Sequence, residues 1–292
     1  MQSFRERFLN AIVEAEPLGL QLVFAHAPVF DAHKIAHNLH LHPELHDTTC
    51  EFQSIVEHPE LADLISGDGP PVAALGLIQF GQHIIKVIQC DAPMPYGPIE
   101  TCIIPALMPG EIKADARAHT AHALLYYAGS HTDALERYVA LAAVAGALAI
   151  FDAIAVLNEE ARTAAPALDL IPDEGEDFLQ TYRTLPIPYL FGGFVKLDIG
   201  DPDRPCARTF ACHRLGLPNL ARHLAGHAET TETFRLFTGI LGYARESGES
   251  LQAGESLDFG GGTRFVLRAP HETEWYLDSP GTILVLEAVA DE

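Results

Sequence analysis

The chain has 292 residues, of which 48% are hydrophobic and 20% charged, a composition typical of a folded protein long enough for two domains. Its 40 Asp and Glu residues outnumber 18 Lys and Arg residues, which gives a net charge of -22. A chain with this charge repels polyanions at long range, which argues against nucleic acids and anionic membranes as partners and favours a basic protein.

The first part of the sequence predicts short helices and strands in mixed order. Apolar residues at helical spacing predict an amphipathic helix over 3–16, and an apolar run predicts a strand over 20–24. Asp31 is expected to cap a helix from Ala32 to Leu41. Further strands are expected over 48–55, 72–80 and 83–89, and a loop is expected over 91–98.

The middle of the sequence contains one ambiguous segment and one expected boundary. Residues 118–127 fit a strand better than a helix, because Gly129 and a clear helix over 132–149 follow directly. The small residues of that helix predict close packing, and a strand is expected over 154–157. Residues 158–177 are acidic and aperiodic, so we expect a linker there between domains at 1–160 and 176–292.

The last part of the sequence again mixes helices and strands. Helices are expected over 176–185 and 230–247, with strands over 194–199, 208–215, 256–259, 263–268 and 282–289. Because strict βαβ alternation is missing, the pattern predicts an α+β fold, with helices packed on largely antiparallel sheets. A weak echo between the hairpins that begin at Leu77 and Leu257 leaves two related halves as one alternative.

Three stretches of the second half carry a resemblance. They are LPIPYLFGGFVKLDIGDPDRPCARTFACHRLGLPNLA, TETFRLFTGILGYARESG and LRAPHETEWYLDSPGTILVLEAV. Over roughly 185–289 the chain resembles a bacterial family catalogued as a domain of unknown function, and FDAHKIAHNLH and ARAHTAHALLYYAG look like the region that accompanies that domain. The resemblance implies a bacterial cytosolic α+β protein and supplies no catalytic residues.

Histidine is unusually frequent near the N-terminus, where seven of the fifteen lie between positions 26 and 58. His33 and His37 stand four residues apart on an expected helix, a spacing that can chelate zinc. A zinc site would need Asp31, His46 or a distant residue as a further ligand. The alternative is a row of partly solvated imidazoles with no cofactor.

Three other groups of polar residues have a plain structural interpretation beside a chemical one. His119 and His122 could share a metal on a helix, but on a strand they are core histidines. Cys206, Cys212 and His213 could supply an activated thiolate, but buried cysteines usually behave as small hydrophobes. The remaining group could bind calcium but more often forms turns; it comprises Asp198, Asp201 and Asp203.

No two of the five cysteines have C-x-x-C spacing, and the N-terminal residues lack the apolar core of a signal peptide. We therefore expect a cytoplasmic protein. The sequence contains no G-x-S-x-G, P-loop or H-E-x-x-H motif. We therefore expect a non-catalytic, immunity- or adaptor-like factor that binds another protein. The alternatives are a metal-dependent hydrolase that uses the N-terminal histidines and a homo-oligomer formed through helix 132–149. The candidate contacts for a basic partner are acidic residues before helix 176–185: Asp173, Glu174, Glu176 and Asp177.

Overall fold

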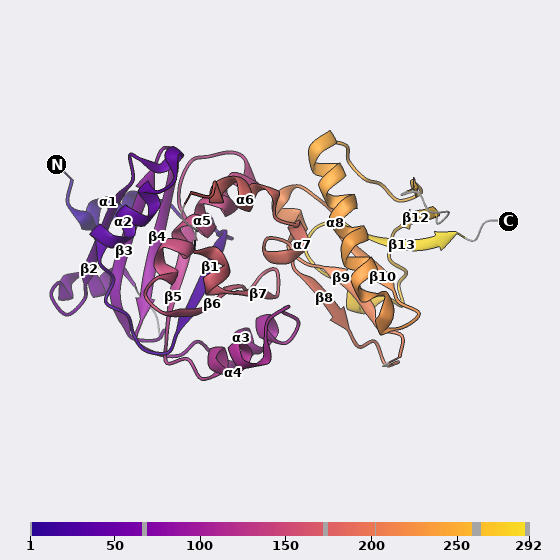
Figure 1. Ribbon diagram of the computed structural model, residues 1–292, viewed down its shortest axis with the longest axis horizontal. Coiled ribbons are helices and arrows are strands. Elements are labelled where there is room, and N and C mark those ends of the chain that lie inside the picture. Colours follow the sequence, from indigo (N-terminus) through magenta and orange to yellow (C-terminus); the bar gives the residue numbers. More distant parts are fainter. Residues whose placement is uncertain (1, 66–68, 172–174, 202, 259–263, 290–292) are drawn as a thin grey trace. The chain divides into compact units, whose positions relative to one another are not determined.

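A computed structural model describes residues 2–65, 69–171, 175–201, 203–258 and 264–289. The chain divides into two compact units (Figure 1). The first unit comprises 1–159 with 164–184, and the second comprises 160–163 with 185–292. Each contains one mostly antiparallel sheet with helices, which confirms the predicted α+β class. No described helix is long and apolar enough to cross a membrane.

The first unit is built on a seven-stranded sheet with the order β2-β3-β4-β5-β1-β6-β7. Its strands are β1 (Gly19–Phe24), β2 (Thr49–Ser54), β3 (Val72–Phe80), β4 (His83–Cys90), β5 (Ala121–Tyr127), β6 (Ala153–Asn158) and β7 (Thr163–Pro166). Strand β5 pairs along its length with both β1 and β4. Within the ambiguous segment 118–127, residues 121–127 are therefore a central strand, as the sequence favours, and His119 lies just before it.

Six helices of the first unit are described: α1 (Phe4–Asn10), α2 (Ala32–His40), α3 (Tyr96–Ile103), α4 (Gly110–Arg117), α5 (Ala134–Ala149) and α6 (Phe178–Thr184). Three short 3-10 turns join them: η1 (Pro43–Leu45), η2 (Pro59–Leu64) and η3 (Ala167–Leu170). The side chain of Asp31 caps α2, as predicted, by accepting from the backbone N–H groups of His33 and Lys34. Helices α3 and α4 cover a buried cluster that includes Val23 of β1 and Leu157 of β6.

Helix α5 is the most deeply buried helix of the first unit. Thirteen of its 16 residues are buried, and it packs against β1, β4, β5, β6 and η3. Gly146 allows η3 to approach α5 closely, because a Cβ atom there would lie 2.0 Å from the carbonyl oxygen of Leu170. The predicted close packing is confirmed. Because α5 is buried within its own unit, it leaves little exposed face for contact with a second copy.

Three expectations for the first unit are corrected. The helix expected over 3–16 ends at Asn10, because Ala11 takes an extended conformation. The loop expected over 91–98 contains the start of α3, which Pro95 precedes in the N-cap position. In the segment 158–177, expected to be a linker, buried small residues form β7 and η3, and the first unit continues to Thr184.

The second unit has a six-stranded sheet with the order β11-β12-β13-β10-β9-β8. Its elements are α7 (Ile187–Leu190), β8 (Phe194–Leu197), β9 (Cys206–Thr209), η4 (Cys212–Leu215), β10 (Asn219–His223), η5 (His227–Glu229), α8 (Thr230–Ser247), β11 (Ser256–Asp258), β12 (Arg264–Arg268), η6 (Trp275–Leu277) and β13 (Ile283–Val289). The strand expected over 208–215 ends at Thr209, since Ala211 adopts a left-handed conformation with φ 62° and the turn η4 follows.

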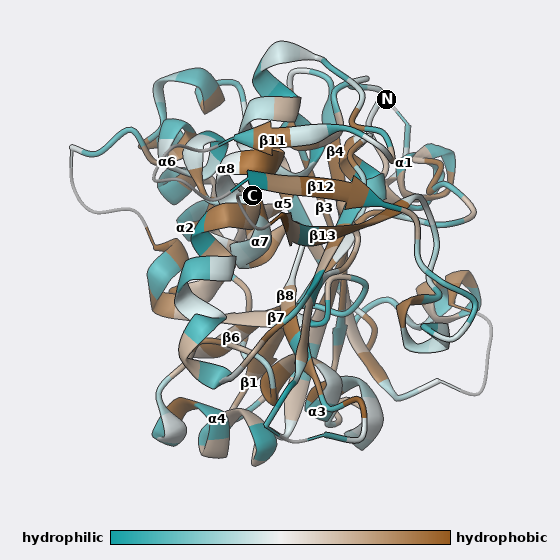
Figure 2. Cartoon of the chain, turned by 90° about the vertical axis from the view of Figure 1, so that its right-hand side faces the viewer, coloured by the Kyte–Doolittle hydropathy of each residue, from teal (hydrophilic) through white to brown (hydrophobic). Residues whose placement is uncertain are grey.

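The two faces of this sheet carry different partners. Helix α8 packs on a cluster that includes Leu220 of β10 and Leu284 of β13. The neighbouring residues Ala221 and Val285 point to the opposite face, where they meet Leu277 of η6. The apolar residues of β12 and β13 stand out in Figure 2. The 3-10 turn η6 is therefore fixed on the face that α8 does not cover.

The two units share a strand–helix–three-strand sequence of elements. It reads β1-α2-β2-β3-β4 in the first unit and β10-α8-β11-β12-β13 in the second. The last strand lies beside the first in the second unit, whereas β5 separates β4 from β1 in the first unit. In this comparison the hairpin β3–β4, which contains Leu77, corresponds to β12 and β13. It does not correspond to the hairpin β11–β12, which contains Leu257 and whose turn lies outside the described residues.

Candidate functional site

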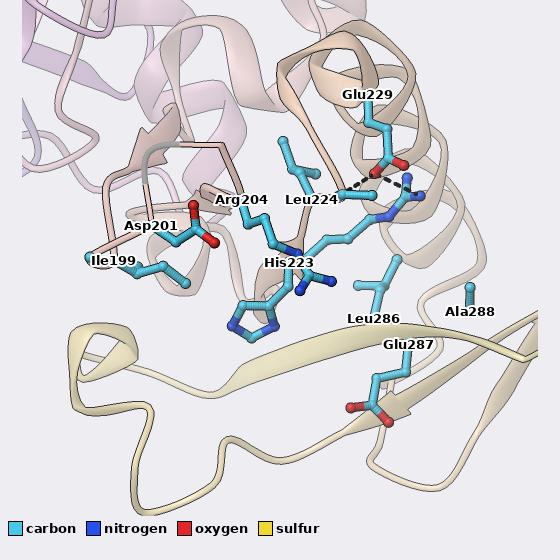
Figure 3. Close-up of a pocket in the computed structure, with 12 residues that line it drawn as sticks. Ile199, Asp201, Arg204, His223, Leu224, Glu229, Leu286, Glu287 and Ala288 are labelled. Carbon is cyan, nitrogen blue, oxygen red and sulfur yellow. Dashed lines mark hydrogen bonds and ion pairs between the residues drawn. The ribbon is translucent and has the colours of Figure 1, made fainter.

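The second unit contains a pocket where two parallel strands diverge. Strands β10 and β13 pair over Asn219–Ala221 and Ile283–Val285. Beyond this stretch, β10 continues its pairing with β9 and β13 continues its pairing with β12. A pocket of about 900 Å³ occupies the fork and is lined by residues from both strands (Figure 3). In open sheets, the carboxyl ends of diverging strands are a common place for ligands.

The fork also presents backbone hydrogen-bonding groups. The N–H of Leu224 donates to the carbonyl oxygen of Pro205, 2.9 Å away, on the β9 side. Residues of an antiparallel strand alternate between bonding their partner strand and pointing away from it. The N–H and C=O of His223 are therefore directed into the fork, where an extended peptide could bind them.

Charged side chains of both signs line the fork. Arg222 donates to the hydroxyl of Thr233 at 3.0 Å and lies 3.5 Å from a carboxylate oxygen of Glu229. The side chain of Arg204 extends toward the same space as His223 (Figure 3), and no ion pair of Arg204 is found in the described part of the chain. The fork can therefore offer a guanidinium group to a ligand.

A hydrogen-bonded network holds His223. Its Nε2 lies 2.7 Å from the hydroxyl of Tyr276 and 3.5 Å from a carboxylate oxygen of Glu274. Arg268 donates two hydrogen bonds to Glu274, each 2.7 Å long, and one to Glu287. The hydrogen bonds from Arg268 lower the pKa of Glu274 to about 2, so this carboxylate stays ionised at neutral pH.

The chain's single tryptophan stands beside this network. Trp275 is 79% exposed, and its ring lies 5.9 Å from that of Tyr276. Arg208, itself buried, donates to the carbonyl oxygen of Tyr276 at 2.9 Å and to the hydroxyl of Ser279 at 2.6 Å. Burial lowers the pKa of Arg208 to about 10, which still leaves it charged at neutral pH. We call Trp275, Tyr276, His223 and Arg204 the fork surface.

A second pocket, of about 400 Å³, lies in the first unit between α5, α6, η1 and the β3–β4 turn. His83 lines it, and its Nδ1 lies 3.1 Å from the hydroxyl of Tyr127. Burial and the neighbouring His131 lower the pKa of His83 from 6.5 to about 4. His83 is therefore neutral in the folded protein at pH 7.

This shift predicts a pH dependence of stability. The unfolded chain binds a proton at His83 below pH 6.5, whereas the folded chain does so only near pH 4. The contribution of neutral His83 to folding is complete above pH 6.5 and is lost as the pH falls to 4. Screening by solvent reduces it to about 1–2 kcal/mol. The free energy of unfolding, measured with urea, should fall more steeply for the wild type than for His83→Phe as the pH is lowered from 6.5 to 4.

Other buried histidines set the background for that comparison. Burial also lowers the pKa values of His42, His119 and His122, and these groups are present in both proteins. The two proteins should therefore both lose stability, and only the difference between their slopes reports His83. Parallel curves would contradict the assignment.

The predicted metal ligands His33 and His37 are both exposed on α2. Asp31, suggested as a further ligand, is engaged as the cap of that helix. Nowhere in the described ranges do three or more histidine, cysteine or acidic side chains form a group that could hold a metal ion. The structure thus adds no third ligand to the pair, and zinc stays a prediction.

The predicted acidic contact is described only in part. Asp173 and Glu174 lie outside the described residues. Glu176 and Asp177 are exposed directly before α6, and Asp177 accepts a hydrogen bond from the backbone N–H of Gln180. Asp177 thus has a structural role at the start of this helix, and the carboxylates of both Glu176 and Asp177 remain exposed.

The other candidate groups have structural roles. Burial raises the pKa values of Cys206 and Cys212 to about 12, so their thiols stay protonated. His213 lies 3.3 Å from Glu160. The remaining side chains hydrogen-bond to nearby backbone: those of His119, His122, Asp198 and Asp201.

Sequence patterns do not predict the fork surface as a site. Trp275 and Tyr276 stand side by side in the sequence, but the contact of Tyr276 with His223 depends on the strand order. No protein-family model, curated protein or solved structure matches this chain. The resemblance to an uncharacterised bacterial family therefore stays a prediction, and the functional argument depends on the site itself.

Proposed function

We propose that this chain is a non-catalytic protein-binding factor that holds its partner on the fork surface. The observation that carries the proposal is the exposure of Trp275, whose ring lies 5.9 Å from that of Tyr276. Tyr276 in turn contacts His223, which lines the pocket together with Arg204. Tryptophan, tyrosine and arginine are the residues that most often dominate the free energy of protein–protein binding. A large exposed ring costs solubility, and a binding role explains its presence.

The support beneath Trp275 favours binding by a preorganised surface. Arg208 fixes the backbone of the 3-10 turn, and the ion pair between Arg268 and Glu274 fixes the region around His223. A surface that is already ordered loses little conformational entropy when a partner binds. Nε2 of His223 is occupied by the hydroxyl of Tyr276 at 2.7 Å, which favours a positioning role over general acid–base catalysis at this nitrogen.

The backbone groups of the fork favour an extended partner segment. A peptide strand beside β10 could bond the N–H and C=O of His223, as strands added to other sheets do. The charge of -22 favours a basic partner, since opposite charge raises the rate of encounter. Glu176 and Asp177 are a second, electrostatic contact in this proposal. The free cysteines Cys50, Cys90, Cys102, Cys206 and Cys212 fit a bacterial cytoplasm.

The proposal is tested by capture on immobilised protein. Wild type, Trp275→Ala and Tyr243→Ala are compared as bait for a lysate of the source cells. Tyr243 is a matched control, because it is a 52% exposed aromatic residue of the same unit on α8. A partner retained by wild type and Tyr243→Ala but lost by Trp275→Ala supports the proposal. Equal retention by all three proteins would contradict it.

A further inference from the structure

The pocket of the first unit has a wall of aromatic rings. The ring centroids of Phe80 and His83 are 5.2 Å apart, and His83 stacks on His131 at 4.9 Å with an interplanar angle of 16°. Nδ1 of His131 lies 3.2 Å from the backbone N–H of Asp133, from which it accepts a hydrogen bond. A neutral His131 therefore carries its proton on Nε2. The low pKa of His83 keeps the imidazole of His83 neutral at pH 7.

Two carboxylates and one guanidinium group complete the lining. Arg183 donates to both oxygens of Glu44 at 2.8 Å, and to those of Glu136 at 2.9 and 3.0 Å. The carboxylates of Glu44 and Glu136 and the guanidinium group of Arg183 sum to one negative charge. A carboxylate can accept about four hydrogen bonds, so both retain acceptor capacity beyond Arg183. The side chain of Glu44 is 54% exposed, which leaves it accessible from solvent.

We propose that this pocket binds the guanidinium group of an arginine side chain from another polypeptide. An anion would face two carboxylates, whereas a cation meets two carboxylates, one guanidinium group and the faces of aromatic rings. The rings favour a planar cation, because guanidinium stacks on aromatic faces and donates paired hydrogen bonds to carboxylates. The site lies in the first unit and is independent of the fork surface.

The probe is N-acetyl-arginine amide, titrated into the full chain at pH 7.5 and followed by NMR of the histidine ring protons. We expect saturable shifts of His83 and His131 with a dissociation constant of about 1 mM, typical of a single side chain. The lysine analogue should bind about fivefold more weakly, because it cannot stack as a plane. The neutral citrulline analogue should give no saturable shift.

The source of the arginine is tested with two further ligands. Free arginine carries an α-ammonium group and an α-carboxylate that must lose part of their hydration beside the pocket, so it should bind more weakly than the capped probe. A short peptide with one internal arginine should bind at least as well as the capped probe. The reverse order would overturn the assignment to a polypeptide side chain.

Three variants and one control variant separate charge from ring contacts. Glu44→Gln should weaken the arginine probe about fivefold, whereas the control Glu111→Gln, an exposed acidic residue on α4, should not. His131→Phe keeps a ring and should retain binding, whereas His131→Ala should lose it. Equal binding of arginine and citrulline probes, or no saturable shift with any probe, would overturn the proposal. If His131→Ala does not fold, the Glu44 comparison still decides.

Discussion

Gly146→Ala should destabilise the first unit by about 2–3 kcal/mol, although alanine is the better helix former. The new methyl carbon would lie 2.0 Å from the carbonyl oxygen of Leu170 and 3.0 Å from the hydroxyl of Tyr182. That hydroxyl donates to the same carbonyl at 2.5 Å, so η3 and α6 would both have to move away from α5. Urea unfolding followed by far-ultraviolet circular dichroism measures the loss.

A second glycine supplies the control for this substitution. Gly239 lies within α8, and a Cβ atom there would meet nothing within 4 Å. Gly239→Ala should therefore gain about 0.5–1 kcal/mol from helix propensity alone. Opposite signs for the two substitutions are expected. If Gly146→Ala leaves the free energy of unfolding unchanged, η3 can move away from α5 without loss of stability. Helix α5 would then be less tightly packed than the contact distances indicate.

Trp275→Ala should weaken binding of the partner by at least about 2 kcal/mol, roughly a 30-fold increase in the dissociation constant. The reason is the loss of a large apolar contact on a preorganised surface. Because the side chain is 79% exposed in the free protein, the free energy of unfolding should change by less than about 0.5 kcal/mol. Isothermal titration calorimetry with the captured partner measures the affinity.

Two further variants make that measurement specific. Trp275→Phe retains an aromatic ring and should recover part of the affinity. Tyr243→Ala removes an exposed ring from α8 and should change the dissociation constant less than about threefold. If Trp275→Ala binds as tightly as Tyr243→Ala, the fork surface is not the interface.

Local signals were sufficient wherever an element has both a clear period and a clear end. Helix α8 runs over Thr230–Ser247 as its apolar spacing predicts, and Gly248, with φ 70°, ends it. Strand β3 matches its predicted span of 72–80, and Asp31 caps α2. In these segments, propensity, periodicity and tertiary packing all favour the same structure.

Prediction failed where burial, not periodicity, decides the structure. Strand β7 is four residues long and all four are buried, but its small side chains give no period that separates a strand from a loop. The turn at Ala211 depends on a left-handed conformation that nothing in the sequence indicates for alanine. The strand expected over 208–215 therefore ends at Thr209, before this turn.

The two sites could not be predicted because each combines distant segments. His223 and Tyr276 are 53 positions apart, and the stacked pair His83 and His131 is 48 positions apart. The fork additionally requires knowing that β10 and β13 are parallel neighbours, which a single sequence does not state. Residue types alone indicate a metal site at the exposed histidines of α2, where the described residues supply no further metal ligand.

Site-specific photo-crosslinking from position 275 is the most direct test of a protein-binding role for the fork surface. A photoreactive phenylalanine analogue is placed there, and separately at position 243, in protein expressed in the source cells. We expect a discrete covalent adduct with one protein from position 275 and no such adduct from position 243. The adduct should form less in Arg208→Met, which removes the hydrogen bonds that fix η6. Identical adduct patterns from the two positions, or no adduct from position 275, would contradict a protein-binding role for the fork surface.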